Sequence, residues 1–492
     1  MRAALLFLPL VVFQAIAQDA KVQVPSASEF RQAEKTVKGL YKDDYAKVGR
    51  ADRVALARKL LESARGTKSD AVVRYYLLVD AKDLGAVNGD PETAFAAIDE
   101  LALSYEVNSS QLRVTALADA KKAAVVLDAA IDLVRFLLKR SDLSSQKEDY
   151  EEASRWMDEA KAVVKNVKEP SLLKEVQALS ADLADARKEA VAAKKAQGVL
   201  TDSFDDPEAN LTLGRYLAFF RSDWDRGLRL MSKGPDGPLK TAAKVEVGGA
   251  LTPETGLEKG EAWLEAAAKA PYKRKTLARA RYWLESSLKT AAGIVRAKIE
   301  KRLDDLDKAD LGPTAVNVAK AFDAKKDSVA GDWKLLGSGI LSPRSVAGVP
   351  HKAIVPFEPG EEYDLRILIE PKEDGHCGIG LVSGSSQAIL SVNGGGCGLA
   401  NIDGADTAAR YSGPLLNDKE IHVLFISVRK TGIAAQFDGK SVLDWRGEAK
   451  RLSVNGLWTV PNAKALFLIS GGSYNFIRIV YVPVTGSGKA LR

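Results

Sequence analysis

The residues Tyr363-Asp364-Leu365-Arg366-Ile367-Leu368-Ile369 decide the fold class of the last third of the chain. Apolar and polar side chains alternate along this stretch, which is the pattern of a β-strand with one buried face. The stretch 422–428 is almost continuously apolar, so we expect a central strand there. Segments 433–437 and 441–445 flank Asp438-Gly439-Lys440, a sequence typical of a tight β-hairpin.

Similar short strands are predicted along the rest of this region, at 378–382, 388–392, 466–469 and 474–482. About ten short strands in roughly 160 residues fit two antiparallel sheets packed face to face. The region before residue 310 has a helical period instead, with many Ala, Leu, Lys and Glu residues. We therefore expect a multidomain chain, with an α-helical part followed by an antiparallel β-sandwich.

The helical region is predicted to form antiparallel helical hairpins with short connections. Asp70 and Asp90 are predicted N-caps, and Pro91 occupies a first helical position, where its missing N–H costs nothing. Residues 111–140 are predicted to form one long helix. From Pro170 onwards, apolar residues follow a 4-3 spacing. This seam forms either a dimerisation coiled coil or a packing face within the chain, and we favour packing within the chain.

The second helical block contains motifs similar to tetratricopeptide repeats, although no strict 34-residue period is present. Leu213-Gly214, Tyr216 and Trp224 resemble one helix–turn–helix repeat, and Trp263-Leu264 with 282–284 resemble another. We expect these aromatic residues to pack in the core. The predicted domains are a signal peptide at 1–17, helical hairpins and long coiled-coil-like helices at 18–200, a second repeat-like block at 201–310, a linker at 311–330 and the β-sandwich at 331–492.

The first residues, MRAALLFLPLVVFQAIAQDA, have the organisation of a secretory signal peptide. Arg2 provides the positive charge, 3–13 is an apolar run, and Ala15-Ile16-Ala17 is a small-x-small cleavage site. No other stretch approaches the ~20 apolar residues that span a bilayer. We expect an exported protein without a transmembrane segment, located in the periplasm, at the cell surface or outside the cell.

Composition excludes several classes of function. The chain has 71 Lys and Arg against 65 Asp and Glu, and this net charge of +6 is too small to indicate nucleic-acid binding. With 3 His and 2 Cys, the chain cannot form multi-ligand zinc sites or a disulfide-dense scaffold, and we expect no cofactor. Cys377 and Cys397 lie on predicted neighbouring strands. In an oxidising compartment they are a candidate disulfide, and the alternative is two buried thiols.

Motifs for catalysis are absent or incomplete. There is no Gly-x-Ser-x-Gly nucleophile elbow, and Gly486-Ser487-Gly488-Lys489 lacks the first glycine and the following helix of a phosphate-binding loop. The cluster of acids at 370–374 is the best candidate for a pair of glycosidase carboxylates, but it is also typical of a charged hairpin loop. Asn401, Asp403 and Asp406 have the oxygen ligands that calcium prefers, but Asp403-Gly404 also reads as a hairpin turn.

Several motifs of the β-region resemble known sandwich domains. Trp333-Lys334-Leu335 with 339–342 is similar to the opening of concanavalin-A-like and laminin-G-like domains. Glu362-Tyr363-Asp364-Leu365-Arg366 resembles a strand of the bacterial 3-keto-disaccharide hydrolase domain, and 378–381, 428–430 with 438–440, and 476–479 match its later strands in order. The whole chain resembles large exported proteins of planctomycete bacteria. The resemblance implies a concanavalin-A-like jelly roll.

The resemblance and the residues together leave three hypotheses for function. Where the hydrolase-type domain usually has Asn-Ser-Gly, this chain has His376-Cys377-Gly378. The first hypothesis is therefore a non-catalytic protein whose helices bind proteins and whose sandwich binds a glycan or another envelope component, with no assigned catalytic or metal-binding residue. The alternatives are a glycoside or 3-keto-disaccharide hydrolase, and a purely structural envelope component. The candidate ligand-binding residues are Trp445, Trp458 and His376, with core packing as the other interpretation of the two tryptophans.

Overall fold

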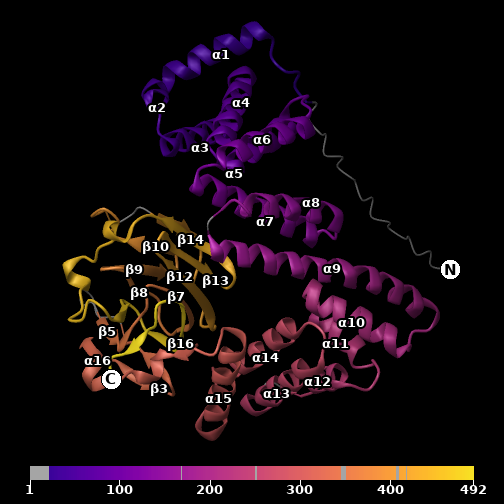
Figure 1. Ribbon diagram of the computed structural model, residues 1–492, viewed down its shortest axis with the longest axis vertical. Helices are drawn as coiled ribbons and strands as arrows, with labels where there is room; N and C mark the ends of the chain where they lie inside the picture. The colour runs from indigo at the N-terminus through magenta and orange to yellow at the C-terminus, as the bar shows by residue number, and fades with distance from the viewer. Residues whose placement is uncertain (1–20, 168, 250–251, 345–350, 406–408, 417) are drawn as a thin grey trace, which may run out of the picture. The chain divides into compact units, whose positions relative to one another are not determined.

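A computed structural model describes residues 21–492, apart from 168, 250–251, 345–350, 406–408 and 417. The chain divides into two compact units, Met1–Lys194 and Lys195–Arg492. The described elements of the first unit are helices, and the second unit combines further helices with a β-sandwich (Figure 1). The sequence therefore predicts the fold class correctly. The predicted signal peptide at 1–17 lies outside the described residues.

The first unit is a series of helices, several of which begin at a residue whose side chain caps the helix. Asp70 accepts a hydrogen bond from the Val73 amide, and Asp90 accepts one from Thr93, so both predicted N-caps are confirmed. The helices are α1 (Ala27–Leu40), α2 (Lys42–Ala46), α3 (Arg50–Gly66), α4 (Ala71–Val87), α5 (Pro91–Ser104), α6 (Ser109–Ala123), α7 (Leu127–Gln146), α8 (Tyr150–Val164) and α9 (Pro170–Asp202), the last of which continues into the second unit.

One predicted helix is wrong in this unit. The segment 111–140 is two helices, because the chain turns at 124–126 between α6 and α7. No glycine or proline marks this turn, so the apolar period continues through it. The seam of α9 does pack within the chain, because Leu172, Val176 and Leu183 are buried in the same cluster as residues of α7 and α8.

The second unit begins with shorter helices that pack closely against one another. They are α10 (Pro207–Arg221), α11 (Trp224–Met231), α12 (Pro238–Val247), α13 (Pro253–Lys269), α14 (Lys273–Ser287) and α15 (Gly293–Asp310). A Cβ atom at Gly214 of α10 would lie 2.7 Å from the Gly227 carbonyl oxygen of α11. Only glycine permits this approach of the two helices, which explains the small residues in the repeat-like motif.

The sandwich consists of two antiparallel sheets. The eight-stranded sheet has the order β14-β13-β12-β7-β16-β4-β3, with β1 also paired to β16, and the seven-stranded sheet has the order β11-β10-β9-β8-β15-β5-β2. The strands are β1 (Val316–Asn317), β2 (Ser328–Ala330), β3 (Lys334–Leu336), β4 (Gly339–Leu341), β5 (His351–Val355), β7 (Glu362–Pro371), β8 (His376–Ser383), β9 (Ser386–Asn393), β10 (Gly396–Ala400), β11 (Ala409–Ser412), β12 (His422–Arg429), β13 (Gly432–Phe437), β14 (Lys440–Arg446), β15 (Leu466–Ser470) and β16 (Tyr474–Thr485). A separate pair joins β6 (Phe357–Glu358) and β17 (Lys489–Ala490).

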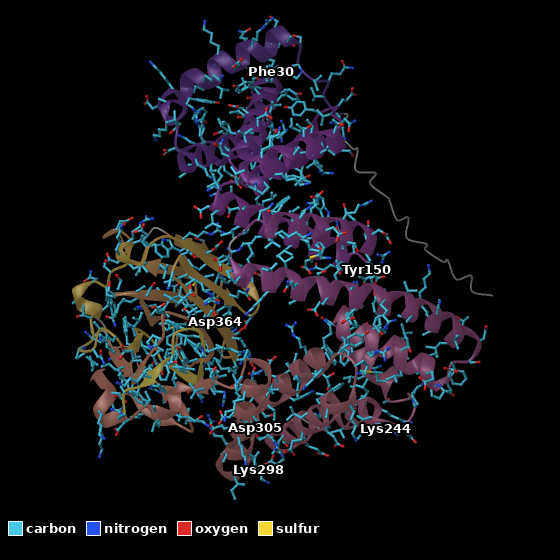
Figure 2. All side chains as sticks on the ribbon, viewed as in Figure 1. Phe30, Tyr150, Lys244, Lys298, Asp305 and Asp364 are labelled. Carbon is cyan, nitrogen blue, oxygen red and sulfur yellow. The ribbon has the colours of Figure 1, made fainter. Side chains whose placement is uncertain are left out.

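Alternate residues of both sheets are buried in the core between them. Figure 2 draws the described side chains on the ribbon. The predicted hairpin is confirmed, because Phe437 pairs with Lys440 and both Asp438 and Gly439 have positive φ angles of 48° and 78°. Leu365, Ile367 and Ile369 of β7 point into this core, as their alternation predicts.

The segment 311–330, predicted as a linker, belongs to the sandwich. Strand β1 pairs with β16, and β2 pairs with β5. Between these strands, Val318, Ala319 and Phe322 are buried in the core. These apolar side chains and strand hydrogen bonds hold the segment in place, so it does not behave as a free connection.

Helices α14 and α15 cover the outer face of the eight-stranded sheet. Leu368 of β7 and Ile477 of β16 belong to one apolar cluster with residues of α13, α14 and α15. A β-bulge lies between Phe476 and Arg478, where the register of β16 against β7 shifts. The bulge brings two consecutive side chains, Ile477 and Arg478, to the helices.

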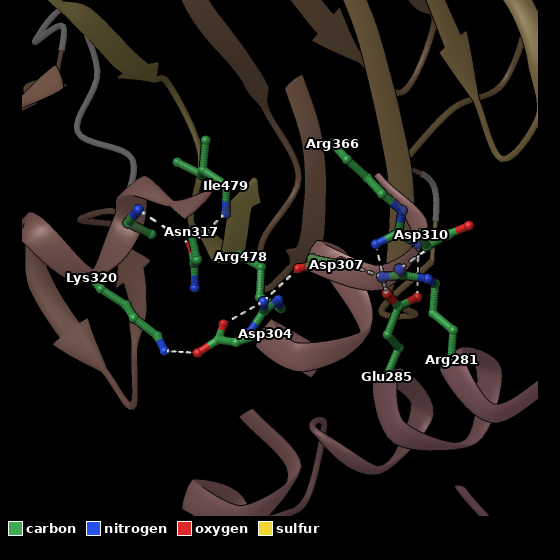
Figure 3. A network of polar contacts seen from close by, with 11 residues as sticks. Arg281, Glu285, Asp304, Asp307, Asp310, Asn317, Lys320, Arg366, Arg478 and Ile479 are labelled. Carbon is green, nitrogen blue, oxygen red and sulfur yellow. Dashed lines mark hydrogen bonds and ion pairs between the residues drawn. The ribbon is translucent and has the colours of Figure 1, made fainter. Parts of the chain in front are cut away.

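Charged side chains complete this contact (Figure 3). Arg478 is only 1% exposed and donates from Nη2 to Asp304 and Asp307 of α15, at 2.8 and 2.7 Å. Arg366 of β7 donates to both carboxylate oxygens of Glu285 in α14, at 2.6 and 2.9 Å. We call the whole set the interface network, and it comprises Arg281, Glu285, Asp304, Asp307, Asp310, Lys320, Arg366 and Arg478.

Among the described helices, none is long and apolar enough to cross a lipid bilayer.

Candidate functional site

The outer face of the seven-stranded sheet is covered by the segment 447–465, which contains η2 (Ala449–Arg451) and η3 (Gly456–Trp458). Ile389, Phe467 and Ile469 point outward from β9 and β15 and form a small apolar cluster with Val460 of this segment. Glycine makes room for this packing, because a Cβ atom at Gly380 of β8 would lie 2.1 Å from the Phe467 ring. The sheet and the segment together form a second, smaller core.

A pocket of about 110 Å³ opens between this face and the covering segment. The strand register explains why the surface is hollow there. Ser391 of β9 pairs with Gly378 of β8 on one side and with Gly398 of β10 on the other, so neither neighbour has a side chain. The residues that line the pocket are His376, Ile389, Ser391, Ala400, Asn401, Ser453, Asn455, Trp458 and Ile469.

His376 and Trp458 meet at the pocket with their rings edge to face. Their ring centroids are 5.5 Å apart and the ring planes are inclined by 84°. Burial lowers the pKa of His376 below its ordinary value of 6.5, so the imidazole is neutral at pH 7. A neutral imidazole offers one N–H donor and one acceptor, and neither ring nitrogen has a hydrogen-bond partner among the described residues.

Amide and hydroxyl groups line the opposite side of the pocket. Asn401 has a positive φ of 60° and donates from Nδ2 to the Ser453 hydroxyl at 2.6 Å. The Ser453 hydroxyl in turn donates to the Asn401 carbonyl oxygen at 3.2 Å. The Asn455 Oδ1 atom accepts from the Leu457 amide at 3.2 Å and caps η3, which carries Trp458. The polar groups are therefore placed by local turn hydrogen bonds.

Lys352 of β5 also holds the covering segment 447–465 in place. Its ammonium donates to the carbonyl oxygens of Leu457 and Thr459, at 3.0 and 2.9 Å, on either side of Trp458. None of the residues that line the pocket carries a charge at pH 7 once His376 is neutral. The site is therefore an uncharged pocket with apolar, aromatic and hydrogen-bonding parts.

Two of the three predicted ligand-binding residues line the pocket, and the third does not. His376 and Trp458 line the same pocket, although they are 82 positions apart in the chain. Trp445 of β14 is only 8% exposed and lies in the core between the sheets, because the alternation of β14 turns it inward. For Trp445, the ligand-binding prediction is wrong and the core interpretation holds.

The predicted disulfide is also wrong. Cys377 and Cys397 are free and buried. Both pair with Val392, so one whole strand separates them. Two strand spacings amount to ~9.5 Å, whereas disulfide-bonded residues have Cα atoms within ~7 Å. Burial raises the pKa of Cys397 to about 12 and that of Cys377 further, so both thiols stay protonated.

The acidic cluster predicted as a possible catalytic pair lies outside the pocket. Glu370 is 3% exposed, forms an ion pair with Lys372 and accepts a hydrogen bond from Asn475 at 3.3 Å. Glu373 pairs with the exposed Arg344 at 3.1 Å. Asp374 lies in the exposed turn between β7 and β8. Since Glu370 and Glu373 are each bound to a cation and point elsewhere, the cluster does not form a pair of carboxylates facing a cleft.

Two of the candidate calcium ligands, Asn401 and Asp403, form hydrogen bonds to other side chains of the chain instead. Asp403 accepts hydrogen bonds from Arg451 with both carboxylate oxygens, from Nε to Oδ1 at 3.1 Å and from Nη2 to Oδ2 at 2.6 Å, and Asn401 donates to Ser453. Asp406 lies outside the described residues. Across the described part of the chain, no group of three or more His, Cys, Asp or Glu side chains is placed to hold a metal ion.

Sequence reasoning missed most of this pocket. Ser391, Ser453 and Asn455 carried no signal of their own, and Asn401 was considered only as a calcium ligand or as part of a turn. One signal was present: glycines alternate in Gly378-Ile379-Gly380 and again in Gly396-Cys397-Gly398. In neighbouring strands such alternation leaves one face without side chains, which marks a hollow on that face.

Comparison with known proteins finds likeness in structure only. No family model matches the chain, and no curated protein is significantly similar to it in sequence. The sandwich is similar to Caenorhabditis elegans galectin LEC-6, with 15% identity over 29% of this chain and 96% of the galectin, and a TM-score of 0.20. It is also similar to a Bacillus subtilis protein of unknown function with a galectin-like fold (11% identity, 34% and 94% coverage, TM-score 0.26) and to the B. subtilis carbohydrate-binding module CBM66 (12% identity, 33% and 93% coverage, TM-score 0.22). Similarity at this level says nothing about what this chain binds.

Proposed function

We propose that this chain is an exported, non-catalytic protein whose β-sandwich binds an uncharged sugar at the pocket between β8–β10 and η3. The observation that supports the proposal is the meeting of His376 and Trp458 with the amide and hydroxyl groups of Asn401, Ser453 and Ser391. A sugar has both apolar C–H faces and many hydroxyls. A site with one aromatic side chain, an apolar base and a few uncharged polar groups complements that mixture.

The exposed surface beside the pocket fits a ligand that extends outward. Leu457 precedes Trp458 in η3 and is 67% exposed. In the lining itself, the Trp458 ring is the aromatic surface beside the polar groups of Asn401, Ser453 and Asn455. Such a surface can contact the C–H face of a sugar ring while the sugar hydroxyls reach the polar groups.

A non-catalytic role is supported by the position of the acids. Hydrolysis of a glycosidic bond needs two carboxyl groups ~5–10 Å apart across the bond. The acids nearest to such an arrangement in the sequence, Glu370 and Glu373, are held in ion pairs with Lys372 and Arg344 and do not line the pocket. We therefore favour the binding protein over the hydrolase and over the purely structural component.

A glycan array tests the proposal with the whole mature chain, residues 18–492. We expect binding to at least one uncharged glycan without formation of a product. The Trp458→Ala variant should weaken that binding by about tenfold or more, since a central aromatic contact is commonly worth at least 1.4 kcal/mol. Phe204→Ala removes another exposed aromatic side chain, far from the sandwich in sequence, and serves as the matched control.

Each other outcome contradicts the proposal in a distinct way. Turnover of a bound glycan would favour the hydrolase, and binding that Trp458→Ala leaves unchanged would place the site elsewhere. If no glycan bound and the protein sedimented as a large assembly, the purely structural role would replace it.

The proposed export rests on the n-region, apolar run and cleavage motif of residues 1–17. Mass spectrometry of the protein from its own cells should show a mature N-terminus at Gln18. The protein-interaction role of the helices stays a prediction, which capture experiments with the mature chain can test.

A further inference from the structure

The size of the pocket limits which part of a sugar can enter it. The pocket holds about 110 Å³. An apolar cavity of about 150 Å³ is known to accommodate one benzene ring. A pyranose ring is no smaller than benzene, so the pocket cannot enclose a whole sugar ring and takes a substituent while the ring stays at the mouth.

The base of the pocket is apolar. Ile389 and Ile469 are buried there, and the methyl group of Ala400 lies beside them. A hydroxyl or hydroxymethyl group at this base would lose its hydrogen bonds to water without replacement, which costs roughly 1–3 kcal/mol. A substituent that ends in a methyl group meets this surface without that penalty.

Polar groups above the base are free to bind an amide. The Ser391 hydroxyl and the His376 ring nitrogens have no hydrogen-bond partner among the described residues, and the Asn401 amide uses only its Nδ2 group, on Ser453. These groups provide donors from Ser391 and His376 and an acceptor from the Asn401 Oδ1 atom. A secondary amide has one carbonyl acceptor and one N–H donor and matches this set.

The charge of the lining excludes other substituents. No Lys, Arg, Asp or Glu lines the pocket. A carboxylate, a sulfate or a protonated amine entering it would be desolvated without an opposite charge, which is strongly unfavourable. The substituent is therefore uncharged.

We propose that this pocket accepts an acetamido group, so that the preferred ligand is a glycan ending in an N-acetylhexosamine. The inference rests on the proposed sugar-binding function and adds the substituent that the pocket recognises. The methyl group lies against Ile389, Ala400 and Ile469, and the amide bonds to the free polar groups of Ser391, His376 and Asn401. The pyranose ring lies at the mouth beside Trp458.

The test compares methyl glycosides that differ at one substituent, with binding measured by ligand-observed NMR on the mature chain. The probes are the glycosides of N-acetylglucosamine, N-acetylgalactosamine, glucose, galactose, glucosamine and glucuronic acid. We expect at least one N-acetyl sugar to bind about tenfold more tightly than its parent hexose, the usual range for a methyl group in a fitted apolar pocket together with its hydrogen bonds. Glucosamine and glucuronic acid should bind more weakly than the N-acetyl sugar.

Two variants locate the preference in this pocket. Ala400→Leu fills the base and should reduce binding of the N-acetyl sugar by about tenfold while leaving the parent hexose unchanged. Ser391→Ala removes one polar group without changing the volume and should reduce the same preference by a smaller factor. Thermal unfolding of both variants checks that they are folded, and Phe204→Ala is again the control.

The outcomes separate this inference from the proposed function. If no N-acetyl sugar binds more tightly than its parent hexose, or a charged sugar binds best, the acetamido inference fails and sugar binding stands. An N-acetyl preference that Ala400→Leu leaves intact also overturns it. If none of the sugars binds, the proposed function fails, and the inference fails with it.

Discussion

The two outer faces of the sandwich differ in the kind of side chain that covers them. On the eight-stranded sheet, the half-buried Arg366 and the buried Arg478 pair with carboxylates of α14 and α15. On the seven-stranded sheet, the segment 447–465 covers an apolar cluster and leaves an uncharged pocket. The first face is closed by paired charges that fix one partner, whereas the second stays open and neutral. A buried network of this kind specifies a single docking arrangement, while a neutral hollow is available to a small ligand.

The largest effect in this comparison is expected at Arg478. Replacing Arg478 with Met removes the cation that Asp304 and Asp307 share and leaves Asp307 buried with Arg281 alone. Loss of one partner of a buried ion pair typically costs about 3–5 kcal/mol of unfolding free energy. Chemical denaturation of the mature chain measures the loss. Arg226→Met, which breaks an exposed pair with Asp223, is the matched control and should change stability by less than about 1 kcal/mol. Equal effects of the two variants would show that the interface network does not hold the helices to the sheet.

A smaller effect concerns the pH dependence of two histidines. Burial lowers the pKa of His422, but hydrogen bonds from its ring to Asp438 and Asp418, each 2.8 Å long, outweigh burial and leave its pKa raised. Its contribution to stability is full below the unfolded pKa of ~6.5 and is lost as the pH rises through the folded pKa. His376 has a lowered pKa because of burial alone, so it reduces stability as the pH falls below ~6.5.

Unfolding of His422→Gln and His376→Gln between about pH 5.5 and 8.5 tests these signs. The stability advantage of the wild type over His422→Gln should shrink as the pH rises. Relative to His376→Gln, the wild type should lose stability as the pH falls. Parallel pH profiles for the two variants would contradict the assignment of opposite environments.

The smallest expected effect is at Lys352. Replacement with Met leaves the two carbonyl groups beside Trp458 without their donor, so η3 should hold Trp458 less firmly. We expect binding of the sugar to weaken by about three- to tenfold, equivalent to ~0.7–1.4 kcal/mol, with the order of preference among sugars unchanged. NMR titration measures the affinity, and Lys450→Met, which changes an exposed lysine in the same segment, is the control. Unchanged affinity in Lys352→Met would mean that η3 is held without this contact.

The periodicity of the strands predicted the sandwich well, but it could not say what covers each sheet. Arg366 alternates with apolar residues in β7, and this pattern predicts a side chain that faces solvent. Its guanidinium instead lies half-buried against Glu285, 81 positions earlier. The bulge at Ile477 and Arg478 breaks the alternation in β16, so no period of two describes it. Long-range partners of this kind are set by docking of helices on the sheet, and local patterns do not encode docking.

Only part of the candidate site could be predicted, because its assembly also depends on contacts between residues far apart in the sequence. His376 was singled out because it lies beside a glycine-rich segment, and Trp458 because an aromatic ring can stack on a sugar ring. Their meeting depends on η3, whose position is set by Lys352 and Asn455. The predicted disulfide was wrong because the number of residues between two cysteines does not show how many strands lie between them. Cys377 and Cys397 lie on the first and third of three adjacent strands.

The sequence separation between Arg478 and its partners has a consequence for the order of folding. Its partners Asp307 and Asp304 precede it by 171 and 174 residues, and β16 pairs with β7, β4 and β1. Contacts of such sequence separation slow folding, because a long loop must close before they form. The eight-stranded sheet and its contact with the helices therefore cannot be completed until β16 has been synthesised.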